Sequence, residues 1–161
     1  MKFQRLRDLR EDKDLYQADI AIMLGIKKSA YSQMEREKIN PSMDKLCILA
    51  DFYNVCLDYL MGRTDDKTPF PHNKHYAAFL KTKSFPVSRL RELRKEKNMT
   101  QAELANIIGL TQHGYSQIET GRKRISSDFV IKLCELYNVN AEYLLNLTEQ
   151  RQPRSANRKH L

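Results

Sequence analysis

The spacing of apolar positions near the middle of the second half of the chain predicts two short helices joined by a sharp turn. Thr100 is a hydroxyl N-cap with Glu103 three residues later, which is the capping-box pattern that begins a helix. Apolar side chains then recur at helical spacing, followed by a glycine that can end the helix: Leu104, Ala105, Ile108 and Gly109. Thr111 can cap a second helix directly after this turn.

The second predicted helix has one apolar face and one uncharged polar face. Tyr115 and Ile118 lie one turn apart on the apolar face. The opposite face gathers short hydrogen-bonding side chains: Gln112 at its edge, His113, Ser116, Gln117 and Thr120. Such side chains suit base edges in the DNA major groove, which is wide enough to admit a helix. A solvated polar face explains the same pattern in an isolated helix. The two helices form a helix-turn-helix unit, and a second copy favours the DNA interpretation.

The chain contains this unit twice. Residues 5–65 align with 89–149 without a gap when the sequence is shifted by 84 positions, and 23 of the 61 aligned pairs are identical. The identical pairs include positions in the helix-turn-helix unit: Gln17 and Gln101, Gly25 and Gly109, Tyr31 and Tyr115, Glu35 and Glu119. So many identities in one register indicate tandem copies of one fold.

Each copy is predicted to form five short helices, so the fold class is all-α. One helix precedes the helix-turn-helix unit and two follow it, the first of these beginning near Ser42 or Ser126. The predicted boundaries are a first domain at 1–65, a linker at 66–84, a second domain at 85–149 and a basic tail at 150–161. The tail has no apolar residue before Leu161 and is expected to be disordered.

The linker is predicted to be partly helical. Pro69 and Pro71 interrupt regular structure, whereas residues 73–83 can form a short helix. This helix carries an apolar stripe, Tyr76, Phe79 and Leu80, which we expect to dock on one of the domains.

Both copies resemble the Xre family, the lambda-repressor-like helix-turn-helix domains of phage repressors and Cro proteins. The resemblance covers about 120 residues and includes the buried positions, the turn glycine and the Gln and Glu pairs given above. It implies that the third helix of each copy enters the major groove while the start of the second helix lies on the phosphate backbone. It also implies two structural ion pairs between the first and third helices: Arg10 with Glu35, and Arg94 with Glu119.

The resemblance also assigns candidate DNA contacts, position by position. Base contacts fall on the third helices: Lys28, Ser29 and Gln33 in the first copy, and Gln112, His113, Ser116 and Gln117 in the second. Phosphate contacts fall on the start of the second helices and on the segments that follow the third helices: Gln17, Gln101, Arg36, Lys38, Arg122, Lys123 and Arg124. The expected function is a sequence-specific, double-stranded DNA-binding transcriptional regulator of repressor type.

The two copies differ at positions that favour an alternative role for the first. Tyr16 and Lys27 stand where the second copy has its threonine caps, and Glu37 stands where it has Gly121. Ile22 and Met23 are more apolar than an exposed second helix needs. They either form a partner surface or are partly buried against the first helix or the linker. The alternative is therefore that one copy, the first rather than the second, is a protein-interaction module.

Charge and composition exclude several other classes. The formal net charge is +8, but the four Lys or Arg residues of the tail and the four of the linker supply most of it, so the domains themselves are nearly neutral. No apolar run is long enough to span a membrane and no signal peptide is present, so a cytoplasmic protein is expected. No nucleotide-binding glycine loop or nucleophile–base pair occurs, so we expect no enzyme activity and no cofactor.

The cysteines and histidines do not indicate a metal site. The three cysteines include no C-x-x-C pair, and reduced, packed thiols are expected. His72 and His75 form H-x-x-H without a third ligand, so no bound metal is expected. No small-molecule effector is inferred.

A homodimer is expected, although two fused recognition helices could also serve a single chain. The family commonly pairs through the end of the fourth helix and the fifth helix, here residues 55–61 or 139–145. These segments concentrate apolar side chains that one small core cannot easily bury: Leu57, Tyr59, Leu60, Met61, Tyr143, Leu144 and Leu145. The linker stripe is the other candidate surface.

Overall fold

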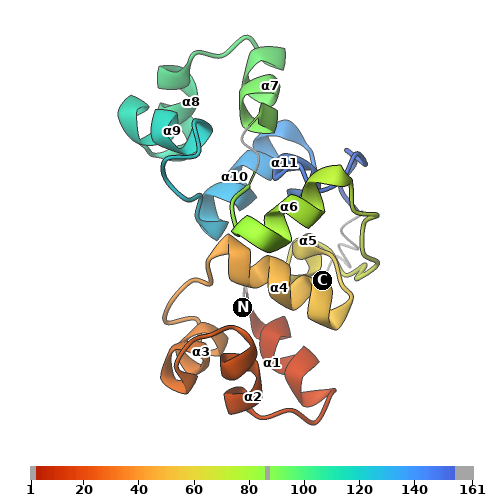
Figure 1. The fold of residues 1–161 in the computed structure, drawn as a ribbon. Helices are drawn as coiled ribbons and strands as arrows, with labels where there is room; N and C mark the ends of the chain where they lie inside the picture. Colours follow the sequence, from red (N-terminus) through yellow and green to blue (C-terminus); the bar gives the residue numbers. More distant parts are fainter. Residues whose placement is uncertain (1–2, 86–87, 155–161) are drawn as a thin grey trace, which may run out of the picture. The chain divides into compact units, whose positions relative to one another are not determined.

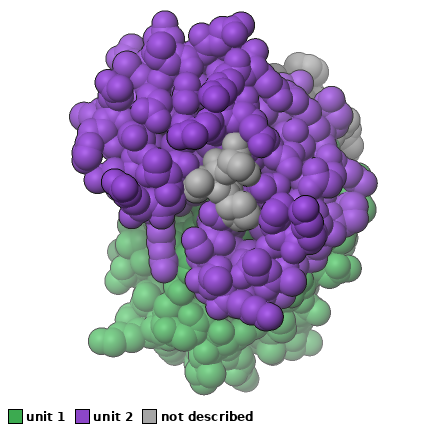
Figure 2. All heavy atoms as spheres, turned by 45° about the horizontal axis from the view of Figure 1, so that its top comes forward, with its two compact units in different colours: residues 1–69, 154–161 green, residues 70–153 purple. Residues whose placement is uncertain are grey.

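The computed structural model describes residues 3–85 and 88–154, and these residues form two compact all-helical units. Unit 1 holds residues 3–69 together with Arg154, and unit 2 holds residues 70–153 (Figure 2). No β-strand occurs among the described residues. The predicted all-α fold class is confirmed.

The described residues of unit 1 form five helices in the order that the sequence predicts (Figure 1). They are α1 (Gln4–Glu11), α2 (Gln17–Met23), α3 (Lys28–Glu35), α4 (Met43–Tyr53) and α5 (Leu57–Leu60). Helices α2 and α3 pack on each other, and their apolar faces meet the other helices in a core whose innermost side chains include Leu6, Ile20, Tyr31, Leu46, Leu49 and Leu60. Burial of this apolar surface is the main force that stabilises so small a unit.

Unit 2 repeats these helices and adds one before them. The added helix is α6 (Lys74–Thr82), and the repeat consists of α7 (Ser88–Glu96), α8 (Gln101–Ile108), α9 (Gln112–Glu119), α10 (Ser127–Tyr137) and α11 (Ala141–Leu144). Its core has the equivalent side chains at its centre, including Leu90, Leu104, Tyr115, Leu133 and Leu144. The two copies therefore use the same apolar positions to hold the same helices.

The turn between the two helices of each helix-turn-helix unit requires a left-handed residue. Gly25 has φ +64° and Gly109 has φ +81°, a region that side chains with a Cβ rarely adopt. The chain can therefore reverse within a few residues, which lets α2 pack on α3 and α8 pack on α9.

The caps of these helices differ between the units as the sequence predicts. Thr100 accepts a hydrogen bond from the Glu103 amide and Thr111 accepts one from the Gly114 amide, at 3.2 and 3.1 Å. Neither Tyr16 nor Lys27 makes a side-chain cap bond. Helices α2 and α3 consequently begin with one fewer satisfied amide each than α8 and α9.

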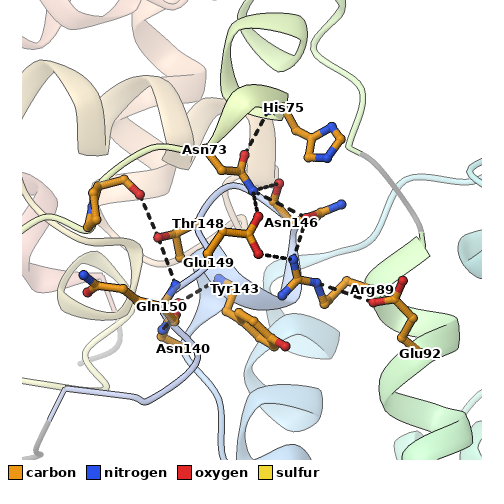
Figure 3. A network of polar contacts seen from close by, with 11 residues as sticks. Asn73, His75, Arg89, Glu92, Asn140, Tyr143, Asn146, Thr148, Glu149 and Gln150 are labelled. Carbon is orange, nitrogen blue, oxygen red and sulfur yellow. Dashed lines mark hydrogen bonds and ion pairs between the residues drawn. The ribbon is translucent and has the colours of Figure 1, made fainter.

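Residues 70–85, which include the helix of the predicted linker, belong to unit 2. Asn73 caps α6 by accepting from the His75 amide, and its own amide donates to the Leu147 carbonyl at 2.9 Å. Thr148 donates to the Pro71 carbonyl at 2.7 Å. Figure 3 shows the side chains of Asn73 and Thr148 between the start of α6 and the loop after α11. The polar contacts hold the segment on unit 2.

Arg89 of α7 completes this network (Figure 3). Its Nη2 donates to Asn146 Oδ1 at 2.8 Å and to Glu149 Oε2 at 3.3 Å, and its guanidinium lies 3.9 Å from the centre of the Tyr143 ring. The Asn73 side-chain amide donates to Glu149 Oε1 at 2.9 Å. Glu149 therefore joins α7 to the segment that precedes α6.

The apolar stripe of α6 is buried at two of its three positions. Tyr76 and Phe79 are 9% and 1% exposed, and the Phe79 ring stacks on Phe85 with centroids 4.7 Å apart. Leu80 is 40% exposed and lies outside this packing. The docking predicted for the stripe is confirmed for the first two side chains and wrong for Leu80.

The segments after α5 and α11 fold back in the same way. The Cys56 amide donates to the Lys67 carbonyl at 3.1 Å, and the equivalent Asn140 amide donates to the Arg151 carbonyl at 3.3 Å. The Asn140 side chain also donates to the carbonyls of Gln150 and Gln152. The first residues of the predicted tail thus have defined contacts in unit 2, and residues 155–161 lie outside the described residues.

The segments expected to supply a dimer surface are buried in the chain. Leu57, Leu60 and Met61 are at most 2% exposed, and so are Leu144 and Leu145. The expectation that these segments carry more apolar surface than the core can bury is wrong. The short helices α5 and α11 point these side chains inward, because the chain folds back after each of them.

Candidate nucleic-acid interface

A buried ion pair joins α7 to the end of the candidate recognition helix α9 in unit 2. Arg94 Nε donates to Glu119 Oε2 at 2.8 Å and Arg94 Nη2 donates to Glu119 Oε1 at 2.9 Å. Burial alone raises the pKa of Glu119, but hydrogen bonds led by that from Arg94 outweigh it and lower the pKa to about 2. The carboxylate is therefore ionised at neutral pH and orients α9 on the first helix of the repeat.

Unit 1 has the same pair between α1 and α3. Arg10 Nε donates to Glu35 Oε1 at 2.6 Å, and Arg10 Nη2 donates to Glu35 Oε2 at 3.1 Å. The Glu35 hydrogen bond raises the pKa of Arg10, and bonds from Arg10 and Gln17 keep the pKa of Glu35 below its usual value despite burial. Arg10 also donates to the Leu15 carbonyl, as Arg94 does to the Met99 carbonyl, so each pair also fixes the turn before the second helix.

Helix α9 presents its predicted base-contact residues on the face away from the core. Gln112 and His113 are exposed, Ser116 and Gln117 are half-buried, and Tyr115 on the opposite face is fully buried. Gln117 Nε2 lies 2.9 Å from His113 Nε2, so these two candidate residues are hydrogen-bonded in this structure. The face is uncharged and has donors and acceptors suited to base edges.

Helix α3 presents a more basic face. Lys28, Ser29 and Gln33 are exposed, and Lys27 is exposed just before the helix. Tyr31 and Met34 on the other face are buried. The two candidate recognition helices therefore have the same orientation on their units but different chemistry, so two units that contact bases must prefer different sequences.

The candidate phosphate-contact residues divide into two groups. Gln17 and Gln101 are half-buried, and their side-chain amides donate to the carboxylates of Glu35 and Glu119 at 2.9 and 3.3 Å. The others are exposed and lie at or just after the ends of α3 and α9: Arg36, Lys38, Arg122, Lys123 and Arg124. The structure places the second group next to the recognition helix in each unit.

Two arginines that the sequence analysis did not single out also reach the buried carboxylates. Arg91 Nε lies 3.2 Å from Glu119 Oε1, and Arg7 Nε lies 3.8 Å from Glu35 Oε2. The repeat contained a signal for them, because Arg7 and Arg91 are an identical pair. Their proximity to the third helix depends on tertiary packing and has no counterpart in local spacing.

The exposed face of α2 is apolar at three positions. Tyr16 and Ile22 are 78% and 79% exposed, and Met23 is 36% exposed. Of the two interpretations given for Ile22 and Met23, burial against the chain is wrong for Ile22. In unit 2 the equivalent positions hold Thr100, Asn106 and Ile107, and Ile107 is 55% exposed, so the second copy keeps one exposed apolar side chain where the first has three.

The chain belongs to the helix-turn-helix transcriptional regulators. A helix-turn-helix family model matches residues 6–60, and a second model, described as a helix-turn-helix domain, matches residues 87–150. The resemblance to the Xre family and the tandem arrangement are confirmed by these two matches. They cover the residues that form α1 to α5 and α7 to α11.

Several curated relatives have regulator names. The uncharacterized HTH-type transcriptional regulator YobD of Bacillus subtilis is 44% identical over 80 residues, which are 50% of this chain and 71% of that protein. The HTH-type transcriptional regulators AnsR and ImmR of the same organism are 37% and 34% identical. Those matches cover 44% and 38% of this chain, and 61% and 49% of the two relatives. No solved structure matches the chain significantly.

Two further properties of the described residues bear on other functions. None of the described helices is long and apolar enough to cross a membrane. Within the same residues, no group of three or more His, Cys, Asp and Glu side chains could hold a metal ion. Cys47, Cys56 and Cys134 are buried thiols that form no disulfide, as predicted.

Proposed function

We propose that this chain is a sequence-specific, double-stranded DNA-binding transcriptional regulator that acts by occupying an operator. In this proposal α3 and α9 enter the major groove, and the basic residues that follow them contact phosphates. One observation carries the proposal. Each unit holds an amphipathic recognition helix by a buried bidentate Arg–Glu pair, with its hydrogen-bonding face left exposed. The names of the relatives support the regulatory role.

We also propose that the chain catalyses no reaction. Glu35 and Glu119 are buried carboxylates with lowered pKa values. Each of them is bound by an arginine that holds the fold together. Lowered carboxylate pKa values in such pairs are explained by fold stability. Regulation by occupancy requires no further chemistry.

The test is selection of bound fragments from a pool of random duplexes, followed by binding measurements on the selected site. Enrichment of a common sequence and its loss in a Gln117→Ala variant support the proposal. Recovery of sequences no different from the starting pool, with equal affinity for all of them, contradicts specific recognition.

The same assay separates DNA binding by unit 1 from the protein-interaction alternative. A Gln33→Ala variant changes the recognition helix of unit 1 alone, and Gln117→Ala changes that of unit 2 alone. Loss of affinity in both variants supports two DNA-binding units. Unchanged DNA affinity in Gln33→Ala, together with lost affinity in Gln117→Ala, assigns DNA recognition to unit 2. Unit 1 then has another role, such as binding a protein through the exposed Ile22.

The homodimer stays a prediction, without the exposed apolar surface that motivated it. Light scattering of the free chain at tens of micromolar measures the mass directly. A mass of two chains supports the dimer, and a mass of one chain near 18.9 kDa contradicts it.

A further inference from the structure

Each unit contains the same four-residue cluster around a buried carboxylate. In unit 2 the Oε1 atom of Glu119 lies 3.2 Å from Arg91 Nε and 3.3 Å from Gln101 Nε2. In unit 1 the Oε2 atom of Glu35 lies 3.8 Å from Arg7 Nε and 2.9 Å from Gln17 Nε2. An arginine of the first helix and the first glutamine of the second helix therefore meet at one oxygen in both units.

The charges in this cluster do not cancel. The Glu119 side chain is 0% exposed and Arg94, 12% exposed, already binds both of its oxygens. Arg91 is 57% exposed, so its positive charge faces solvent next to a carboxylate whose charge is already compensated. In unit 1 the corresponding side-chain exposures are 0% for Glu35, 10% for Arg10 and 39% for Arg7. In unit 2 the cluster thus presents one excess positive charge at the surface, whereas in unit 1 Glu11 lies 3.3 Å from Arg10 Nη2 and adds a second negative charge.

The position of this positive charge in the fold indicates what it can bind. Glu119 is the last residue of α9 and Gln101 is the first residue of α8, so Arg91 lies where the first, second and third helices of the repeat meet. When the third helix occupies the major groove, the second helix crosses the phosphate backbone. A guanidinium and a side-chain amide that share one acceptor in the free protein are spaced to share one phosphate in the complex.

We propose that Arg91 with Gln101, and Arg7 with Gln17, form a phosphate clamp in each unit, in addition to the basic residues that follow the recognition helices. Phosphate replaces the buried carboxylate as the partner of the exposed arginine, and the Arg94–Glu119 or Arg10–Glu35 pair stays intact. The inference rests on the proposed DNA-binding function and adds two arginines to it.

Neutralising variants of the full chain test the clamp. Arg91→Gln should weaken binding to specific and random duplexes alike and lower the slope of log affinity against log salt by about 0.9. Between about 50 and about 200 mM salt, the affinity of the variant should therefore fall about threefold less than that of the wild type. Arg91→Lys keeps the charge and should keep the slope.

Two controls separate this effect from folding and from bulk charge. Lys81→Gln removes the same charge from α6 and should leave the slope unchanged, because Lys81 is an exposed residue in the last turn of that helix and is not part of the cluster. Urea unfolding of each variant reports the stability of unit 2. If Arg91→Gln does not fold, Arg7→Gln tests the same arrangement in unit 1, where the ion pair is longer at 3.8 Å.

The outcomes distinguish the clamp from the proposed function. An unchanged salt slope in folded Arg91→Gln and Arg7→Gln, with a wild type that binds DNA, overturns the clamp and leaves the function standing. A slope that falls as much in Lys81→Gln overturns it as well, since the effect then follows net charge. A wild-type chain that binds no duplex overturns the proposed function itself.

Discussion

Gln117 donates a hydrogen bond to His113 across one turn of α9, with 2.9 Å between the two Nε2 atoms. Because an amide nitrogen only donates, the imidazole nitrogen is the acceptor in this contact. Two side chains predicted to contact bases are therefore oriented by each other before DNA is bound. Their contributions to recognition should not be independent.

This pairing predicts energetic coupling in a double-mutant cycle. His113→Ala and Gln117→Ala should together cost less affinity for the selected site than the sum of the single changes, by about 0.5–1 kcal/mol or more. The reason is that loss of either partner already removes the shared hydrogen bond. Binding titrations on one duplex measure the cycle, with Gln112→Ala and His113→Ala as the comparison pair. If the changes in binding free energy are additive in both cycles, the coupling is contradicted.

Base specificity is predicted to reside mainly in α9. Gln112→Ala or Gln117→Ala should cost about 1–3 kcal/mol on the selected site and relax the preference at one base pair, because an amide pairs with base edges through two hydrogen bonds. Affinities for a set of single-base variants of the site give the measurement. Losses that are equal on selected and random duplexes contradict a base contact and indicate a phosphate contact instead.

The basic segment after α9 is predicted to bind phosphates. Lys123→Gln should weaken binding to all sequences alike and lower the salt slope by about one unit, because one fewer counterion is released from the DNA. Because the Lys123 side chain is exposed, its substitution should not disturb folding, and thermal unfolding of the variant checks this. A salt slope identical to that of the wild type shows that the side chain stays in solvent.

Acid should destabilise unit 2 through Glu119. Its pKa is about 2 in the folded chain against a usual 4.5, so its stabilising contribution is complete above about pH 5 and is lost as the pH falls through the interval from 4.5 to about 2. Glu119→Gln should lower the free energy of unfolding by about 3 kcal/mol at neutral pH, since it removes the negative charge that balances Arg94, whose side chain is only 12% exposed. Urea unfolding between pH 7 and pH 3 measures both effects. A variant that shows the same pH dependence as the wild type assigns that dependence to other carboxylates.

The different caps of the two recognition helices offer a matched pair of substitutions. Lys27→Thr should stabilise the start of α3 by about 1 kcal/mol, and Thr111→Ala should destabilise the start of α9 by a similar amount. The physical reason is one amide hydrogen bond, present at 3.1 Å from Gly114 to Thr111 and absent at Lys27. Native-state hydrogen exchange of the two helices reports the local opening energies. If α3 is unaffected by Lys27→Thr, its stability is set by packing of Tyr31 and not by the cap.

Local pattern was enough to predict most of the fold. The capping box at Thr100, the left-handed turn at Gly109 and the stripe of Leu104 and Ile108 each depend on residues within a few positions of one another. Because the two copies align at a constant offset of 84 residues, each helix predicted in one copy is also predicted in the other. The exposed polar face of α9 followed from the same helical spacing, because one buried face leaves the other to solvent.

The sequence by itself therefore determined the helices, their duplication and the faces that they expose. Tertiary structure decided which distant residues meet: it joined Asn73 to Leu147, buried Leu60 and Leu144 instead of exposing them, and placed Arg91 beside Glu119. The physical reason is the range of the interactions. Caps, turns and helical periodicity act over three or four positions, whereas an ion pair or a buried contact depends on how helices pack in space, and no local spacing records it.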